Sequence, residues 1–403
     1  MSFNTPWFNQ QDPSFFNSLN KSKVAHVILT AESEDFADEV TQQWRDEGFN
    51  VVYVPFGNGG NDYATRIRMT GDSLGVGEQY AVVAFDEAAA AMLEVHVKPS
   101  TPRICAVVAY YPTAIPPPST KFPPSVRVMV HLAGSTVGVR RHPEILGIQS
   151  KKTKTIRKNV EPGAGYGGCV KIGFKTYSYP TCAPGFAEHD VDEYDAVNER
   201  LAFSRSLNMV KRAFRIEEDL EMARDDIVGL VDDVQTDKVM QRTMPFGHVI
   251  NAPTLVGGAG TQAMRYFYDD LFEPLPEGGK TTLLSRTTSG DRVVDELYMN
   301  FTHSVEMPWL LPSIPPTNRQ IEIVVISIVT LRGGKLESEH VYWDQASVLF
   351  QAGLLNPKLA LPDGMKKKGV KKLPIVGAEA ARAVKRGSSR QMNLFNKSTG
   401  GAD

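Results

Sequence analysis

The sequence predicts two domains of different class, an N-terminal α/β domain and a C-terminal α+β domain. The chain has 403 residues, more than one ordinary hydrophobic core accommodates. Apolar strands alternate with helices as far as about residue 214, which is typical of a parallel sheet covered on both faces. Beyond residue 244 a helix precedes strands that are joined by a Gly333-Gly334 hairpin turn, which is typical of an α+β arrangement.

The first domain is predicted to contain six strands separated by helices. A strand at 23–31 precedes a helix at 34–47, in which Phe36, Val40 and Trp44 recur at helical spacing before Gly48. The other predicted strands lie at 50–55, 80–85, 103–110, 126–132 and 170–177, and the other helices lie at 87–95 and 192–214. These elements define a first domain at 1–214.

A charged, helix-compatible segment at 215–243 is predicted to link the two domains. The second domain, at 244–360, is predicted to form a helix at 262–272 and strands at 291–303, 320–331 and 335–343. The tail at 361–403 carries nine Lys or Arg and one Glu between residues 364 and 390, which predicts a flexible, solvated terminus. The alternative for Lys366 to Lys372 is a nuclear-import or polyanion-binding patch.

The composition excludes several classes of function. With 42% hydrophobic residues, 22% charged residues and a net charge of -2, the chain has no bulk attraction to nucleic acid or membrane. Cys105, Cys169 and Cys182 are too widely spaced for a disulfide framework or a zinc site, and residues 1–20 lack a signal-peptide pattern. We therefore expect a cytoplasmic protein with no metal or organic cofactor, no membrane partner and at most weak nucleic-acid contacts of its tail.

The junction at 84–89, Ala-Phe-Asp-Glu-Ala-Ala, joins a predicted strand directly to a helix. Such a turn presents the nucleophile of an α/β-hydrolase. Around it, five segments follow one another in the order of the dienelactone hydrolase family: VILTAESED, WRDEGFNVVYVPF, RICAVVAYYP, VRVMVHLAG and YPTCAPGFA. Residues 22–214 thus resemble this family, and the resemblance implies an α/β-hydrolase fold with Asp86 at the nucleophile position.

The same resemblance implies that the hydrolase chemistry is lost. Pro184 stands in place of the family's catalytic histidine, and Ser135 to Val137 stand where its acid would be. A catalytic triad acts as a unit, so a nucleophile without its base and acid loses the mechanism. A hydrolase rebuilt around Asp86 is the third functional hypothesis. His189 is either its substitute base or a solvent-facing side chain.

A glycine-rich segment at 163–168 satisfies the Gly-x-Gly-x-x-Gly pattern of dinucleotide binding. That motif requires a strand before it and a helix after it, whereas here Pro162 precedes it and a strand follows. The segment is therefore predicted to be a mobile, glycine-rich loop, and the basic run at 151–158 is predicted to belong to the same exposed insertion.

Residues 244–355 resemble the SnoaL-like polyketide cyclases. Three segments carry the resemblance: LLSRTTSGDRVVDELYMNFTH, PWLLPSIPPTNRQIEI and GGKLESEHVYWDQASVLFQAGLL. The resemblance implies a cone-shaped α+β barrel with an internal cavity for a polyketide-like ligand, and a homodimer formed through the sheet. Some members close polyketide rings by aldol chemistry and others only bind, so the fold does not determine the reaction.

The resemblance implies an Asp on the last long strand as general acid and base, and Asp344 is the best match. A carboxylate in an apolar cavity can take a proton from carbon and return it. His340 and His303 are expected to be its polar neighbours. Four further side chains are expected to bind the ligand: Tyr266, Asp295, Trp309 and Tyr342.

Each of these assignments has a structural alternative. Asp344 precedes a helical run and is equally suited to be a helix N-cap. Asp295 and Glu296 are placed to pair with Arg286 or Arg292. A histidine on an apolar strand face is more often a satisfied core residue than a catalyst.

The leading functional hypothesis is an enzyme of specialised metabolism that cyclises or isomerises a polyketide-like molecule in its C-terminal cavity. In this hypothesis the first domain is not catalytic. The alternative is a non-catalytic binding or scaffold protein whose basic tail recruits a partner.

Overall fold

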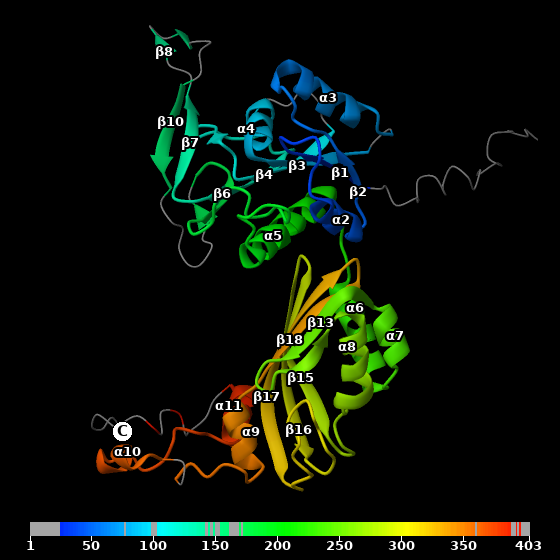
Figure 1. Cartoon of the computed structure of the whole chain (residues 1–403), viewed down its shortest axis with the longest axis vertical. Coiled ribbons are helices and arrows are strands. Elements are labelled where there is room, and N and C mark those ends of the chain that lie inside the picture. Colours follow the sequence, from blue (N-terminus) through cyan, green and yellow to red (C-terminus); the bar gives the residue numbers. More distant parts are fainter. Residues whose placement is uncertain are drawn as a thin grey trace, which may run out of the picture. The chain divides into compact units, whose positions relative to one another are not determined.

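The computed structural model describes residues 25–75, 78–97, 103–141, 144–145, 148–149, 154–160, 169–170, 172–358, 361–387, 392 and 395. The chain forms two compact units, Met1–Glu217 and Glu218–Asp403 (Figure 1). The glycine-rich segment at 163–168 lies outside the described residues.

The first unit is built on a seven-stranded sheet in which every pair is parallel except the edge pair β11–β12. This sheet confirms the predicted α/β class. The strand order is β11 (Cys169–Val170), β12 (Lys175–Tyr179), β6 (Arg127–Ala133), β4 (Ile104–Tyr110), β3 (Tyr80–Phe85), β1 (His26–Thr30) and β2 (Asn50–Tyr53).

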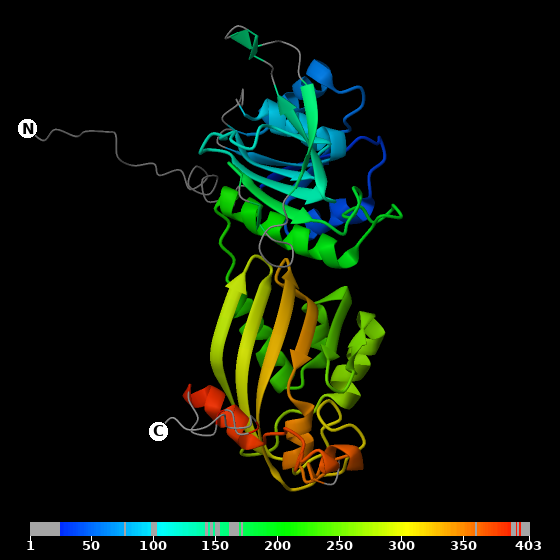
Figure 2. The ribbon, with the colours of Figure 1, turned by 90° about the vertical axis from the view of Figure 1, so that its left-hand side faces the viewer.

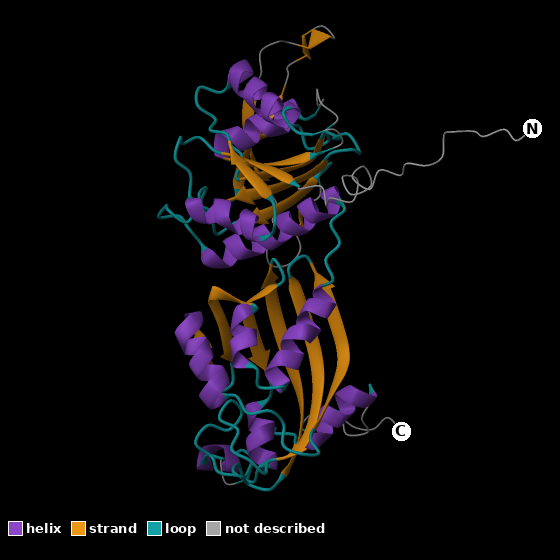
Figure 3. Ribbon diagram, turned by 90° about the vertical axis from the view of Figure 1, so that its right-hand side faces the viewer, coloured by secondary structure: helices purple, strands orange, loops and turns teal. Residues whose placement is uncertain are grey.

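Helices cover both faces of this sheet (Figure 3). On one face lie α2 (Asp38–Asp46) and α5 (Ala196–Phe214), whose Trp44 and Phe203 rings are 5.2 Å apart. On the other face lie α3 (Gly60–Asp72) and α4 (Asp86–Val95). Because both faces are covered, the central strand β3 is apolar and buried along its whole length.

A smaller three-stranded sheet in the order β10-β7-β5 adjoins this core. It consists of β5 (Ala114–Ile115), β7 (Thr136–Arg141) and β10 (Lys154–Asn159), and a separate ribbon pairs β8 (Glu144–Ile145) with β9 (Ile148–Gln149). The basic run at 151–158, which was predicted to lie in an exposed insertion, therefore contains most of strand β10. All of β10 is exposed, so it lacks the apolar alternation from which a strand is predicted.

The second unit is built on a six-stranded sheet whose long strands β15 to β18 lie side by side and curve together (Figure 2). All neighbours are antiparallel except β13 and β18, which confirms the predicted α+β class. In sheet order the strands are β14 (Val256–Ala259), β13 (Thr243–Asn251), β18 (Lys335–Tyr342), β17 (Gln320–Arg332), β16 (Arg292–Thr302) and β15 (Lys280–Ser289).

Apolar side chains of this core come in part from α6 (Leu220–Asp232), α7 (Thr236–Gln241), α8 (Gly260–Tyr266) and the π-helical turn η1 (Phe267–Leu271). The first two come from the segment that was predicted to be a linker. They belong to the second unit because Leu220, Ile227 and Val239 are buried in its core.

The C-terminal region contains α9 (Gln345–Gln351), α10 (Asp363–Lys367) and α11 (Ala378–Arg386). Part of the tail that was predicted to be flexible is therefore a docked helix. Ala381 is buried, the Arg382 guanidinium binds the Glu322 carboxylate, and the Lys385 ammonium lies 4.0 Å from the centre of the Tyr298 ring. No helix in the described part of the chain is long and apolar enough to cross a membrane.

Candidate functional site

The second unit encloses a cavity of about 390 Å³ between its sheet, α6 and η1. This volume is in the range of small-molecule binding sites. The wall is largely apolar, formed by Val249, Phe267, Phe272, Leu297, Met299 and Trp309. Polar groups are gathered on α6 and on the facing strands β16, β17 and β18.

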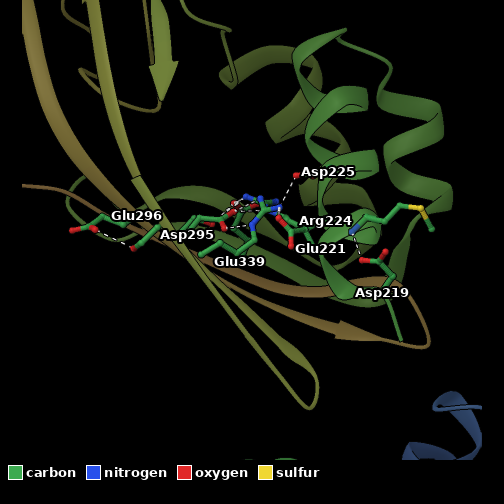
Figure 4. A network of polar contacts seen from close by, with 11 residues as sticks. Asp219, Glu221, Arg224, Asp225, Asp295, Glu296 and Glu339 are labelled. Atoms are coloured by element: carbon green, nitrogen blue, oxygen red, sulfur yellow. Dashed lines mark hydrogen bonds and ion pairs between the residues drawn. The ribbon is translucent and has the colours of Figure 1, made fainter. Parts of the chain in front are cut away.

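Arg224 of α6 is the centre of the polar group (Figure 4). Its side chain is 6% exposed, and its Nη2 lies 2.6 Å from Glu339 Oε1 and 3.1 Å from Ser327 Oγ. Its Nε lies 3.4 Å from Asp295 Oδ2. The Ser327 hydroxyl also donates to Glu339 Oε1, at 2.7 Å. The sheet brings these groups together because Asp295 and Ser327 are register partners on adjacent strands.

Arg286 of β15 extends this network toward solvent. Its Nε donates to Asp295 Oδ1 at 2.6 Å and its Nη2 to Asp295 Oδ2 at 3.1 Å. Its Nη1 reaches Asp225 at 2.7 Å (Figure 4). Hydrogen bonds to Asp295 and Asp225 raise the pKa of Arg286. Burial lowers the pKa of Arg224, but Glu339 and Asp295 outweigh that effect and raise it overall.

Glu339 differs from Asp295 in how its oxygens are used. Both oxygens of Asp295 accept from arginine, whereas the bonds found for Glu339 within the described residues all go to Oε1. Its Oε2 therefore has no hydrogen-bond partner among them, on a side chain that lines the cavity and is 14% exposed. Asp232 of α6 also lines the cavity, and partial burial raises the pKa of its carboxyl group.

Tyr268 lines the same cavity from η1 and is 5% exposed. Its hydroxyl oxygen is buried and has no hydrogen-bond partner in the described part of the chain. Burial raises the pKa of Tyr268, the negative charge of Glu339 raises it further, and Arg224 lowers it. The hydroxyl is thus within electrostatic range of the polar group around Arg224.

Two of the predicted site residues line this cavity. Asp295 projects into it from the predicted face of its strand, together with Leu297 and Met299. It pairs with Arg286, which was the structural alternative for this carboxylate. Trp309 forms part of the wall, and its indole N–H donates to the Glu273 carbonyl at 2.8 Å.

The expectation that Asp344 lies inside the cavity is corrected. Asp344 is exposed and caps α9, where its Oδ1 accepts from the backbone N–H of Ala346 at 3.1 Å and of Ser347 at 3.3 Å. The N-cap alternative therefore describes its position, since a carboxylate before a helix can satisfy N–H groups of the first turn.

The other expected neighbours of Asp344 also lie elsewhere. His340 is on the opposite face of β18 from Glu339, and its Nε2 lies 3.0 Å from Nε2 of His248. His303 is fully buried, and its Nδ1 contacts Thr317, so it is held in the core. Tyr266 and Tyr342, expected as cavity walls, are 56% and 43% exposed and do not line the cavity.

Sequence reasoning missed four residues of the polar site: Arg224, Ser327, Glu339 and Tyr268. A signal for Arg224 is present, because Leu220, Arg224 and Ile227 recur at helical spacing within the supposed linker. For Glu339, the alternation of the strand at 335–343 separates the side chains into two faces. It does not say which of these faces lines the cavity. In the described part of the chain no three His, Cys, Asp or Glu side chains are arranged to hold a metal ion.

In the first unit, the predicted elbow is a sharp turn between β3 and α4. Asp86 has φ +49°, a conformation that few residues other than glycine adopt. Pro184 lies in an exposed turn and offers no base. The half-buried His189 ring is tilted against the Tyr194 ring, with 4.4 Å between the ring centres. Asp86 therefore lies in a sharp turn with positive φ, and no base is hydrogen-bonded to its side chain within the described residues.

Asp86 is expected to destabilise the first unit at alkaline pH. Burial, and then the charges of Glu32 and Glu87, raise the pKa of Asp86 to about 6 from 3.8. Ionising the carboxyl therefore costs more in the folded than in the unfolded chain, and this cost grows as the pH rises through about 6. Asp86→Asn, which tolerates positive φ, should stabilise the unit by about 1 kcal/mol near pH 8, after discounting for solvent screening.

Thermal melting near pH 4 and pH 8 checks this expectation, since the gain should vanish at the lower pH. The exposed Asp35→Asn is the matched control. An equal gain from Asp86→Asn at both pH values would show that ionisation is not its cause.

No family model matches the sequence, and no curated protein matches it. Solved structures that resemble the chain include SnoaL-like and NTF2-like proteins, which align with about a third of it. A protein named as a SnoaL-like polyketide cyclase from Jannaschia sp. CCS1 is 17% identical, with 35% of this chain and 98% of that chain covered and a TM-score of 0.29.

For TsrD from Streptomyces laurentii the identity is 16%, the coverage is 34% of this chain and 100% of that chain, and the TM-score is 0.28. An NTF2-like protein from Burkholderia xenovorans LB400 is 13% identical, with 33% of this chain and 95% of that chain covered and a TM-score of 0.26. The dienelactone hydrolase resemblance of the first unit, the homodimer and the cytoplasmic location stay predictions.

Proposed function

We propose that the second unit binds a largely apolar small molecule in its cavity and catalyses proton transfer within it, as a cyclase or isomerase. Glu339 is the general base in this proposal, and Arg224 stabilises the negative charge that develops. The observation that carries the proposal is that Glu339 Oε2 has no hydrogen-bond partner among the described residues, whereas Arg224 and Ser327 hold the carboxylate in place through Oε1.

The reaction begins when Glu339 Oε2 removes a proton from a carbon next to a carbonyl group of the bound molecule. The electron pair of that C–H bond moves into the carbonyl group and gives an enolate. The guanidinium of Arg224 remains positive beside this charge, in a cavity where apolar walls limit screening by water. A donor that is already oriented stabilises the charge without reorganisation.

The enolate can react in two ways, and Glu339 and Arg224 serve both reactions. If protonated Glu339 returns its proton to a different carbon, the product is an isomer of the substrate. If the enolate carbon attacks a second carbonyl group of the same molecule, a C–C bond closes a ring and the new alkoxide takes the proton from Glu339. Both outcomes regenerate the carboxylate.

The test uses a neutral model ketone, methyl naphthyl ketone, with the full-length protein in D₂O. Wild-type protein is expected to accelerate hydrogen–deuterium exchange at the carbon next to the carbonyl, which mass spectrometry measures. Glu339→Gln should lower this rate by about 100-fold or more, since general-base catalysis contributes about 10²–10⁴-fold. Glu296→Gln is the matched control, because Glu296 bonds to Ser285 on the opposite face of the sheet from Asp295.

Hydrogen–deuterium exchange of the ketone at the wild-type rate in the Glu339→Gln protein would rule out Glu339 as the base. Ketone binding without any exchange in the wild type would instead support the non-catalytic binding alternative. The first unit is proposed to be non-catalytic, because the described residues provide no base bonded to Asp86. Unchanged exchange in Asp86→Asn would agree with this.

A further inference from the structure

Tyr268 has a hydroxyl group for which the described part of the fold provides no partner. The side chain is 5% exposed, its oxygen is buried, and no hydrogen bond to it is found within the described residues. A buried hydroxyl without a partner is destabilising, because it gives up its hydrogen bonds to water and gains none within the fold. Phenylalanine would fill the same space without this cost, so packing alone does not account for tyrosine here.

The backbone at Tyr268 is also unusual. The residue belongs to the π-helical turn η1, which continues directly from α8. Such turns are rare and are frequent at functional sites, because the additional residue changes the direction of the following side chains. Tyr266, two residues earlier, is 56% exposed on α8, whereas Tyr268 lines the cavity.

The charge around the cavity restricts what can bind beside Tyr268. Carboxylates outnumber guanidinium groups among the lining residues, which include Asp225, Asp232, Glu273, Asp295 and Glu339 against Arg224 and Arg286. Both arginines are already engaged by carboxylates. An anionic ligand would therefore meet net negative charge, so the cavity favours a neutral molecule.

We infer that the Tyr268 hydroxyl donates a hydrogen bond to a carbonyl oxygen of the ligand, and that the ligand is a neutral, mostly apolar ketone or ester. This inference rests on the proposed function only in assigning the ligand to the same cavity. It makes Tyr268 the specificity-determining residue. The hydroxyl positions the carbonyl oxygen, and the cost of burying it unpaired is recovered when the ligand binds.

Three probes of nearly equal shape test this by isothermal titration calorimetry with the full-length protein. Methyl naphthyl ketone presents a carbonyl oxygen, isopropenylnaphthalene replaces it by an isosteric CH₂ group, and naphthoate carries a negative charge. Wild-type protein is expected to bind the ketone about 10-fold more tightly than the alkene, the fold-change of one net hydrogen bond. Naphthoate should bind more weakly than the ketone.

Tyr268→Phe should reduce the preference for ketone over alkene to less than about 2-fold and leave alkene binding unchanged. Tyr266→Phe, two residues earlier, is the matched control and should retain the wild-type preference. Without ligand, Tyr268→Phe should melt at or above the temperature of the wild type, because an unpaired polar group is removed. A merely structural hydroxyl would give a lower melting temperature and an unchanged preference.

Equal binding of ketone and alkene by the wild type, or an undiminished preference in Tyr268→Phe, would overturn the inference. Tighter binding of naphthoate than of the ketone would overturn the neutral-ligand part. These outcomes are independent of the exchange experiment. Absence of proton exchange with an intact ketone preference would reject catalysis while retaining Tyr268 as the ligand anchor.

Discussion

Arg224→Met is expected to lower the free energy of unfolding of the second unit by about 3–5 kcal/mol, the range for breaking a buried ion pair. Methionine fills much of the same space, so the loss is mainly electrostatic. Asp295 retains its two bonds to Arg286, but Glu339 retains only the Ser327 hydroxyl. An uncompensated carboxylate would then remain in a largely apolar wall.

Hydrogen exchange of β16 to β18 in increasing urea measures this loss separately for the second unit of the full-length protein. Arg265→Met is the control, because the Arg265–Asp237 pair is exposed and such pairs contribute about 0–1 kcal/mol. The double substitution Arg224→Met and Glu339→Gln should recover a large part of the loss, since it removes the orphaned charge. Equal losses for Arg224→Met and Arg265→Met would contradict the central position of Arg224.

The first unit is expected to lose stability in acid through His131. This residue is fully buried on β6, with Nε2 2.9 Å from Ser206 Oγ and Nδ1 3.0 Å from the Tyr179 hydroxyl. Its ring stacks on Tyr110 at 4.7 Å. Burial, and then the charges of Arg205 and Lys175, hold the pKa of His131 well below its usual 6.5.

The direction of the pH dependence follows from the difference in proton uptake between the folded and the unfolded chain. Below about pH 6.5 the unfolded chain takes up a proton at His131 and the folded chain does not, so the free energy of unfolding falls with decreasing pH. The expected slope is about 1.4 kcal/mol per pH unit, which amounts to about 2 kcal/mol between pH 6.5 and 5. Above pH 6.5 this contribution is constant.

Urea unfolding at several pH values, compared between wild type and His131→Gln, isolates this residue from other titrating groups. The difference in stability between the two proteins should shrink as the pH falls, because only the wild type pays for keeping the imidazole neutral. His131→Ala should in addition lose about 3 kcal/mol at neutral pH, from the cavity and the broken hydrogen bonds. If the difference in the free energy of unfolding between the two proteins did not change with pH, a group other than His131 would be responsible for the loss of stability in acid.

The strands of the first sheet could be predicted because they are buried on both faces. Continuous apolar runs such as that of Tyr80–Phe85 have no other favourable place than the interior of a parallel sheet. Helix α3 was missed because Gly60, Asn61 and Gly71 have low helix propensity. Tertiary packing of Tyr63 and Ile67 compensates for it. Strand β15 was missed because it lies at an edge and is mostly exposed.

A site residue could be predicted where the alternation of a single strand determines its position. It could not be predicted where several elements together form the cavity wall. The alternation in β16 correctly put Asp295 on the cavity face. On β18 the same alternation allowed either His340 or Glu339, and only the helices that cover one face distinguish them. Arg224 comes from a segment that was interpreted as a linker. When one wall of a cavity comes from a distant part of the sequence, such as α6, the residues of the other walls carry no sequence pattern that reveals it.

Helix α6 also defines what an autonomous module of this protein would be. A gene fragment that began at residue 244, where the family resemblance starts, would encode the sheet but omit the helix that supplies Arg224. Asp295 and Glu339 would then face water without their shared counter-charge. Recombination or domain shuffling that preserved this charge network would therefore have to break the chain near Glu217, ahead of α6, rather than at the first strand of the sheet.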